Sequence, residues 1–490
     1  MAPNYNKILM KDYDKLIYEK EKLEDIIKEQ RAEIKILNKN VDDLKDIIGK
    51  QNEQINSLFL EIERLKNNND KDSTNSSKPS SKNGFKEVKN SREKTDRKPG
   101  GQKGHKGHTS KASKVKKLIE SGKVKHNVFE INKTKKNKNK AFRTRYIQDI
   151  EILTTINEYH YYPNEKGSYE IPKKQSNIVT YGSTVKAISG LLVHRAPVSM
   201  DQTVNFLNAI TSGNFDISKA SLSNWSNTLS GNLDSLMFEI EQGLYNSYLV
   251  NTDESPVNVN GKTKQLHNYS NEKYTLQVLH DKKSKAAIEE INFLPNYMGI
   301  LIHDHNKVQY NYGTRHGECN AHILRYIKAV SDFTSHKWPS KMTDCLKEIL
   351  HNKHLLKDDN ILSFDKSVLK KYSQKYDDIL KTATKEYQSD CQKNAYKDHE
   401  RRLITRLKKY KENHLLFMYD FKIPFTNNRA ESDIRPVKRK LNVGIFRSQN
   451  GANVYLQIRN FISTFLKNNY DIFEAMKNAF DNKEISLNQG

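Results

Sequence analysis

Three acidic residues, Asp253, Asp304 and Glu431, stand at positions where their carboxylates could share a metal ion. The stretch YNSYLVNTDESPVNVNG predicts a short apolar strand that ends at Asp253, and GILIHDH predicts a buried strand that ends at Asp304. In FTNNRAESDIRPVKRKL, Thr426 or Asn427 is expected to cap a helix whose first turn contains Glu431. Carboxylate oxygens are the ligands that Mg²⁺ prefers in proteins, so the three acids are candidate metal ligands.

The residues that follow Glu431 suit phosphate chemistry. Arg435 and Lys438 come at i+4 and i+7, on the same face of the predicted helix, and Arg439 lies beside them. Two hard cations about 3.5–4 Å apart can activate the attacking oxygen and stabilise the leaving oxygen when a phosphodiester is cut. Taken singly, each acid has a plainer interpretation, because an Asp at a strand end is usually a turn residue and Glu431 could merely favour the helix dipole. The three acids and the following bases together predict a two-metal site.

The elements around the first two acids must bring them together. Residues 245–305 predict the order strand, strand, strand, helix, strand, with the middle strands in KTKQLHNYSN and KYTLQVLHD and the helix in KKSKAAIEEINFL. In a ribonuclease-H-like sheet the first and fourth of these strands are neighbours, so this order favours an α/β core of that type. Asp304 and Glu431 are 127 residues apart (431 − 304), which is far more than one helix requires. Residues 331–420 therefore predict an all-α insertion between two parts of the core, 245–330 and 421–490.

The first 70 residues carry a heptad repeat. Position d is Leu in six of eight heptads and position a is a β-branched aliphatic in six of eight, which favours a parallel two-stranded coiled coil that dimerises the chain. A single amphipathic helix packed on its own domain is the weaker alternative, because such a helix rarely keeps a 3.5-residue period for so long. The a positions are Tyr13, Lys20, Ile27, Ile34, Val41, Ile48, Ile55 and Ile62, and the d positions are Leu16, Leu23, Gln30, Leu37, Leu44, Gln51, Leu58 and Leu65.

The positive charge is concentrated in one segment. The whole chain has 83 Lys plus Arg and 59 Asp plus Glu, for a net charge of +24. Residues 71–145 alone hold 24 Lys or Arg and 6 Asp or Glu, which gives +18 (24 − 6). Residues 71–125 therefore predict a basic, partly disordered linker that could be a simple tether or could also bind DNA. Its candidate DNA contacts are Lys98, Lys103 and Lys106.

From residue 183 the composition becomes globular. The segments STVKAISGLLVHRA, DQTVNFLNAI and SKASLSNWSNTLS predict short helices, the second of which opens with a capping box at Ser199. Residues 183–244 could form a helix-turn-helix unit that binds DNA, or a helical layer of the core with Trp225 packed inside it. The chain ends in RNFISTFLKNNYDIFEAMKNAF, which predicts a pair of helices that packs on the core.

Other functional classes are disfavoured by what the sequence lacks. It contains no run of eighteen apolar residues and no apolar signal-peptide core, so a cytoplasmic protein with no membrane partner is expected. Its three cysteines, Cys319, Cys345 and Cys391, form no CxxC pair. A disulfide framework and a four-cysteine zinc site are therefore not expected.

Several motifs, in order along nearly the whole chain, resemble those of transposases of the IS66 insertion-sequence family. NSSKPSS with RKPGGQKGHKGH is similar to the family's entry segment, and NTDESPV is similar to its first-acid motif. GILIHDH and CNAHILR resemble the second-acid motif and the segment after it, and FTNNRAESDIRPVKRKLNVGIFRSQNGA resembles the block that holds the third acid. The resemblance implies a coiled coil, a basic linker, a mainly helical DNA-binding region and a ribonuclease-H-like core. It also implies that Asp253, Asp304 and Glu431 are the catalytic and metal-binding residues of a DDE enzyme.

The same resemblance implies cofactors and partners. Two Mg²⁺ or Mn²⁺ ions would serve cleavage at the ends of the element and strand transfer into target DNA, at the bacterial nucleoid. The implied partners are the terminal inverted repeats, target DNA, a second copy of the chain and accessory proteins of the same element. The family's CxxC pairs are absent from residues 126–182, which are expected to be a degenerate finger without zinc. Two alternatives stay open: an inactive coiled-coil DNA-binding regulator, and a ribonuclease-H-like nuclease without strand transfer.

Overall fold

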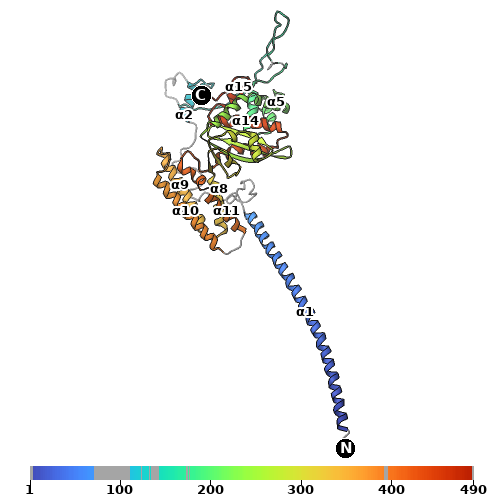
Figure 1. Ribbon diagram of the computed structural model, residues 1–490. Coiled ribbons are helices and arrows are strands. Elements are labelled where there is room, and N and C mark those ends of the chain that lie inside the picture. Colours follow the sequence, from blue (N-terminus) through green and yellow to red (C-terminus); the bar gives the residue numbers. More distant parts are fainter. Residues whose placement is uncertain are drawn as a thin grey trace. The chain divides into compact units, whose positions relative to one another are not determined.

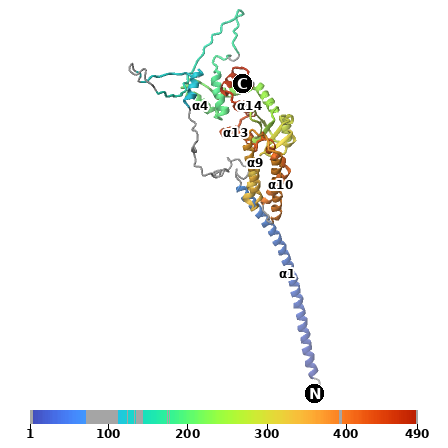
Figure 2. The same cartoon turned by 90° about the vertical axis from the view of Figure 1, so that its left-hand side faces the viewer.

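The computed structural model describes most of the chain, which divides into two compact units (Figures 1 and 2). Residues 71–110 of the predicted basic linker, which include Lys98, Lys103 and Lys106, lie outside the described residues, whereas its residues 112–120 form helix α2. The described residues are 4–70, 111–122, 124–131, 133, 143–172, 175, 177–390 and 395–487. The first unit consists of Met1–Lys89, His322–Ile349 and Lys366–Lys411, and the second of Asn90–Ala321, Leu350–Asp365 and Glu412–Gly490.

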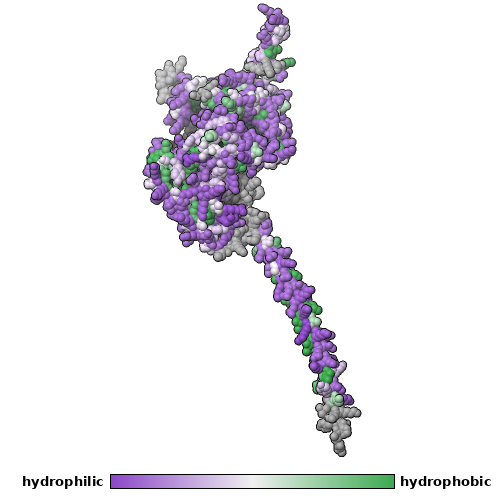
Figure 3. Space-filling view, in the orientation of Figure 1, coloured by the Kyte–Doolittle hydropathy of each residue, from purple (hydrophilic) through white to green (hydrophobic). Residues whose placement is uncertain are grey.

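The N-terminal segment forms one unbroken helix, α1 (Asn4–Asp70), of 67 residues. It contains no proline, and its apolar residues recur every three or four positions, as an amphipathic helix requires. The described side chains at the a and d positions are exposed, for example Leu16 at 63% and Ile34 at 57%. Figure 3 shows apolar residues along the surface of this helix. The long N-terminal helix is confirmed, and its pairing in a coiled coil stays a prediction.

A mixed five-stranded sheet forms the centre of the second unit. β1 (Leu249–Val259), β2 (Lys262–Ser270) and β3 (Thr275–His280) are consecutive antiparallel strands, drawn in green to yellow in Figure 1. β4 (Ile300–His303) is parallel to β1, and β5 (Arg315–Glu318) is parallel to β4. The order across the sheet is β3-β2-β1-β4-β5. The first and fourth strands are therefore neighbours, as the sequence predicts.

Two features of this sheet differ from the sequence-based expectation. β1 does not end at Asp253, because its ladder with β2 continues to Val259. Pro256 is tolerated inside this strand because β4 pairs only with Leu249–Asn251 of β1, so proline breaks no ladder bond to β4. β5 has no counterpart in the prediction, because its sequence, RHGE, has no large apolar residue to mark a strand.

Helices pack on the sheet through two buried clusters. Val250 and Tyr269 of the sheet belong to one cluster, together with apolar residues of α6, α14 and α15. Val257 of β1 belongs to the other, together with Ile434 and Val437 of α13. The bounds of these and the connecting elements are α6 Asp234–Tyr245, α7 Lys285–Ile291, η4 Leu294–Asn296, η5 Gln309–Asn311, α13 Asn428–Val443, α14 Gln449–Lys467 and α15 Ile472–Phe480.

The helices before the sheet belong partly to a small core of their own. Leu207, Ile217 and Leu222 form a separate cluster with Trp225 packed against it, whereas Leu229 joins the main core. The predicted cap at Ser199 is confirmed, since its hydroxyl accepts the Gln202 N–H at 3.2 Å. A helix-turn-helix function for this segment stays a prediction. The elements are α2 Ala112–Glu120, α3 Ser183–Gly190, η3 Leu191–Arg195, α4 Met200–Ile210 and α5 Lys219–Gly231.

The chain between β5 and α13 is mainly helical, as predicted for the insertion. In the first unit the Trp338 side chain is fully buried, and its indole N–H donates to Glu400 at 2.6 Å. His336 Nδ1 is hydrogen-bonded to the same carboxylate oxygen at 2.7 Å, so this buried acid is satisfied. In the described part of the chain, no helix has the length and apolar character needed to cross a membrane. The helices are α8 Asn320–Phe333, α9 Trp338–Asp358, α10 Lys366–Ser389, α11 Ala395–Lys409 and α12 Lys411–Tyr419.

Candidate active site

Asp253 and Asp304 are in register on neighbouring parallel strands. The ladder pairs Asn251 of β1 with Ile302 of β4, and each acid comes two residues after its member of this pair. Side chains alternate between the two faces of a sheet, so residues two apart in a strand point to the same face. Asp304 follows the last residue of β4 directly. The register therefore places the two predicted acids side by side.

Helix α13 supplies the third predicted acid. Glu431 lies in its first turn, as the sequence predicts. Ile434 and Val437, three and six residues later, are buried in one cluster with Val257 of β1. Val257 is four residues after Asp253 in the same strand, so their side chains leave the sheet on the same face. Helix α13 thus covers the face of the sheet to which the first acid belongs.

Electrostatic effects on Asp253 place Asp304 and Glu431 within Coulomb range of it. Burial raises the pKa of Asp253 to about 7, and the negative charges of Asp304 and Glu431 act in the same direction. The Lys438 ammonium and a hydrogen bond from the Glu254 backbone N–H, at 2.8 Å, oppose this rise in pKa. Coulomb interactions weaken with distance, so Asp304, Glu431 and Lys438 all lie near the first acid. Four residues from three distant parts of the sequence are brought together.

The other predicted phosphate contacts lie on α13. Arg435 and Arg439 are exposed, as is Lys438. Arg435 comes one helical turn after Glu431, and Arg439 one further turn along the same face. Guanidinium groups bind phosphate through two parallel N–H donors, and exposure leaves these donors accessible. The helix therefore presents one acid and three accessible bases in succession.

Asn427 ties the start of α13 to β1, and the predicted side-chain cap is wrong. Asn427 occupies the N-cap position, but its side chain makes no hydrogen bond to the first turn. Its amide instead donates to the Thr252 carbonyl at 2.7 Å, and its side-chain oxygen accepts from Asn251 at 2.9 Å. Its backbone N–H donates to Cys319 Sγ at 3.2 Å. The sequence around Asn427, including Thr426 and the cap pattern, does not predict these hydrogen bonds, because Asn251 and Thr252 lie on a strand that is distant in the sequence.

Glu254 joins β1 to the loop that follows the second acid. Its side chain belongs to the face opposite Asp253, and its Oε1 accepts from Asn306 at 2.9 Å and Gln309 at 3.2 Å. The Thr252 hydroxyl donates to Oε1 of the same Gln309 side chain at 2.6 Å. Burial raises the pKa of Glu254, and both amide hydrogen bonds oppose that rise. These supporting residues are not identified by the sequence pattern, which marks only the acids.

The histidines that flank Asp304 each have a polar partner in the fold. His305, at a positive φ of 69°, donates from Nδ1 to Glu318 Oε1 at 2.9 Å, and the Tyr310 hydroxyl donates to the same oxygen. His303 Nε2 lies 3.3 Å from His316 Nδ1. Burial lowers the pKa of His303 to about 3, so this imidazole is neutral at physiological pH. These contacts anchor the backbone on both sides of the second acid.

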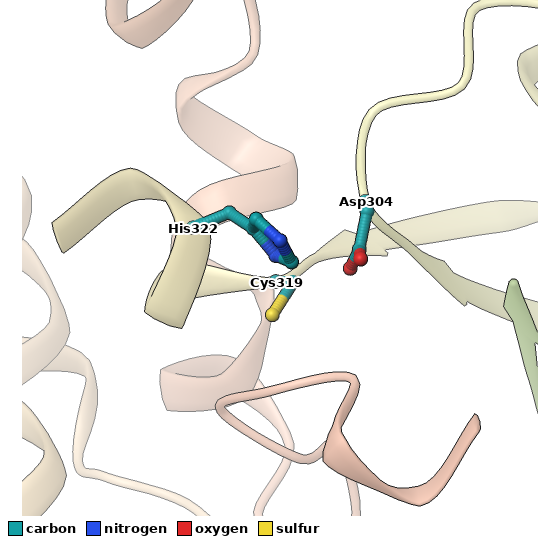
Figure 4. A group of neighbouring side chains, drawn as sticks. All are labelled: Asp304, Cys319 and His322. Carbon is teal, nitrogen blue, oxygen red and sulfur yellow. The ribbon is translucent and has the colours of Figure 1, made fainter. Parts of the chain in front are cut away.

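A second possible ligand group adjoins the second acid. Asp304, Cys319 and His322 each offer one ligand atom, and these atoms lie within 4.8 Å of one another (Figure 4). Oxygen, sulfur and nitrogen donors together suit zinc better than Mg²⁺. A structural zinc site has four ligands, whereas this group has three, and the thiol already accepts the Asn427 N–H. The expectation that the protein holds no zinc stays a prediction.

The carboxylates of Asp253, Asp304 and Glu431 have the oxygen donors that a hard divalent cation takes, although they do not form a three-ligand group with atoms within 4.8 Å of one another in the described part of the chain. Mg²⁺ and Mn²⁺ take oxygen ligands, and this site offers three carboxyl groups on the sheet and α13. Burial and repulsion by the other two acids both raise the pKa of Asp253. A bound cation would remove that repulsion by supplying positive charge at the same place.

The fold has acids on neighbouring strands, a helical insertion and a basic helix, and these features suit an enzyme that processes DNA. Comparison with known families identifies the class as transposases. Residues 206–454, which are 249 of the 490 residues (454 − 206 + 1), match the family described as Transposase IS66 family, and the chain belongs to it. The match contains all three acids and runs from α4 into α14, and it confirms the predicted relationship. Residues 19–111 match a family of unknown function (DUF6444). No curated protein matches the chain.

Proposed function

We propose that this chain is a DDE transposase that cuts DNA at the ends of its element and joins them to target DNA. The observation that carries the proposal is the electrostatic convergence of Asp304 and Glu431 on Asp253. The order β3-β2-β1-β4-β5, with three antiparallel strands followed by two strands parallel to β1, supports a ribonuclease-H-like core. Membership of the IS66 family supports transposition as the overall outcome.

Each residue near the site has a role in this proposal. Asp253, Asp304 and Glu431 would hold two Mg²⁺ or Mn²⁺ ions, which when bound would help to activate the attacking oxygen and neutralise phosphate charge. Lys438 offsets the acids' charge in the free protein and would contact phosphate in the complex. Arg435 would orient the strand through a paired hydrogen bond to phosphate.

The proposed reaction has two steps at one set of acids. Water attacks the phosphodiester at the element's end and releases a 3′-OH. That hydroxyl then attacks a phosphodiester of target DNA, so one bond forms as one breaks and no covalent protein–DNA link is needed. The contacts of Asn427 and Glu254 would hold the acid-bearing segments in place during both steps.

The proposed partners follow from the same assignment. DNA would be held by the basic residues of α13 and by the basic linker, with residues 183–244 as a further DNA-binding region. A second copy would pair through α1, whose a and d side chains are exposed in the single chain. Accessory proteins of the same element would complete the assembly.

The proposal is tested by incubating the purified protein with duplex DNA from the ends of its element, a target plasmid and Mg²⁺. We expect strand cleavage that leaves a 3′-OH and, later, products in which that end is joined to the plasmid. Cleavage without joining would identify a nuclease instead, and end-specific binding without cleavage would identify an inactive regulator.

A further inference from the structure

We propose that the exposed face of α11, in the helical insertion, is a docking surface for duplex DNA that contacts phosphates without reading sequence. The proposal rests on the transposase function above and adds to it a DNA contact in the first unit of the chain, separate from the unit that holds the acids. Its chemistry is a row of four bases, of which Arg401 alone pairs with an acid among the described residues.

Helix α11 has one apolar face and one basic face. Leu403, Ile404 and Leu407 are buried and anchor the helix to its own unit. The residues at positions i, i+1, i+4, i+7 and i+8 from Arg401 are all exposed, and these spacings fall on one side of an α-helix. We call the four bases among them the α11 basic face: Arg401, Arg402, Lys408 and Lys409.

The charges of the α11 basic face are largely unbalanced. Arg401 lies 3.3 Å from Asp398 in an exposed pair, which contributes little. Among the residues that the structure describes, neither Arg402 nor Lys408 forms an ion pair. The second acid of this helix, Glu400, is buried and bonded within the unit, so it does not offset the bases at the surface.

Two lysines of the neighbouring helix α10 are paired with acids. Its Lys375 pairs with Glu348 at 2.5 Å, and its Lys381 pairs with Asp378 at 2.9 Å. Both pairs are largely exposed, and a surface with both signs interspersed is sufficient to keep a protein soluble. A single-sign face instead produces a field that attracts a polyanion. Arg402 and Lys408 of α11 have no such acid partner among the described residues, which favours a polyanion over a merely solvated face on α11.

The length of the α11 basic face suits the spacing of phosphates. From Arg401 to Lys409 there are eight steps, which at about 1.5 Å per residue span about 12 Å along the helix axis. One strand of a duplex presents a phosphate about every 3.4 Å along its axis, so about three or four phosphates lie within that length. Residues 322–349 and 366–411 together have 19 Lys or Arg and 9 Asp or Glu, so the surrounding net charge is +10 (19 − 9) and favours the same partner.

The test compares two variants of the full-length protein with the same change in charge. In one, the α11 basic face is replaced by glutamine, and in the matched control four α10 lysines are replaced: Lys370, Lys375, Lys381 and Lys385 to Gln. Affinity for a random-sequence duplex is measured in EDTA at several salt concentrations, and circular dichroism checks that both variants are folded. Each lost phosphate contact should lower the slope of log K against log salt by about 0.9.

We expect the α11 variant to lower this slope by about 2 to 4, and the α10 control to lower it by less than about 1. Wild-type affinity and slope in the α11 variant would overturn the proposal, as would equal losses in both variants, which would indicate a simple effect of net charge. Because the assay measures DNA binding and involves no cleavage, failure of this docking proposal can be distinguished from failure of the proposed catalytic function. A protein that binds through α11 but never cuts DNA would refute the catalytic proposal alone.

Discussion

The side-chain amide of Asn427 donates a hydrogen bond to the backbone carbonyl of Thr252 at 2.7 Å, across 175 residues of sequence. Thr252 immediately precedes the first acid, and Asn427 immediately precedes the helix that carries the third. Both ends of the bond are buried. The large helical insertion separates these two segments in the sequence. The direct contact between Asn427 and Thr252 nevertheless holds the segments that carry Asp253 and Glu431 next to each other.

Replacing Asn427 by alanine should weaken both folding and catalysis. The change leaves the Thr252 carbonyl and the Asn251 amide buried without this partner, at about 1–3 kcal/mol each, so the free energy of unfolding should fall by about 2–6 kcal/mol. DNA cleavage should fall more than DNA affinity, because the third acid shifts. Denaturant titration and cleavage assays would measure both effects. The control is Asn428→Ala, at the next and exposed position, and a wild-type cleavage rate in Asn427→Ala would contradict the role.

Removing any one of the three acids should abolish both chemical steps. Asp253→Asn, Asp304→Asn and Glu431→Gln preserve side-chain volume but remove a ligand charge worth several kcal/mol in the transition state, so cleavage and joining should each fall by at least about a hundredfold. Binding to DNA should persist in gel-shift assays. Asp281→Asn, at an exposed ion pair with Lys264, should cleave normally. Near wild-type turnover by any of the three variants would remove that residue from the site.

The metal-free protein should lose stability as pH rises from about 4 to about 7. Because the folded-state pKa of Asp253 is raised to about 7 from its ordinary 3.8, the folded protein holds a proton that the unfolded chain has already released. Extra protons on the folded state in this range mean that the free energy of unfolding falls with pH, by on the order of 4 kcal/mol at most. Urea titrations in EDTA at about pH 4 and about pH 7 would measure the decline.

Two comparisons isolate the source of that decline. Asp253→Asn cannot ionise, so it should lose less stability than wild type over the same pH range. Mg²⁺ should restore stability to wild type at about pH 7, because it binds the folded state and competes with protons. An identical decline in Asp253→Asn would show that other groups cause the effect.

Association of the chain should depend on the a and d positions of α1. Ile34 occupies an a position and Ile36 lies off the seam, yet both are exposed on the same helix, at 57% and 63%. Ile34→Glu should weaken self-association strongly, because it would put a charge in the apolar seam, whereas Ile36→Glu should leave it nearly unchanged. Analytical ultracentrifugation would compare them. Equal sedimentation of Ile34→Glu and wild type would place the interface elsewhere, as would a dimer that survives deletion of residues 1–67.

The purified protein should contain less than stoichiometric zinc. The predicted finger segment has no cysteine, and the group of Asp304, Cys319 and His322 has three ligands. Elemental analysis after dialysis would measure the metal content. If one tightly held zinc per chain were found, and Cys319→Ser released it, the group in Figure 4 would be the zinc site and the expectation would be wrong.

Local sequence patterns were sufficient for the elements that depend on near neighbours. The heptads predict α1, and short apolar runs predict β4 and the helices that follow it, because periods of 3.5 and 2 residues report which side of an element is apolar. The types and order of Asp253, Asp304 and Glu431, with their motifs, were sufficient to predict the family. These features can be predicted without knowing which distant segments of the chain contact one another.

Contacts between distant segments were decided only by the tertiary structure. The bonds of Asn427 join it to residues more than 100 positions away in the sequence. The length of β1 beyond Asp253 depends on its ladder with β2, and the edge strand β5 depends on its ladder with β4. The raised pKa of Asp253 likewise arises from burial and from charges on β4 and α13. Hydrogen bonds and Coulomb forces act over a few ångströms in space, whereas sequence periodicity reports only the few residues along the chain that form one element.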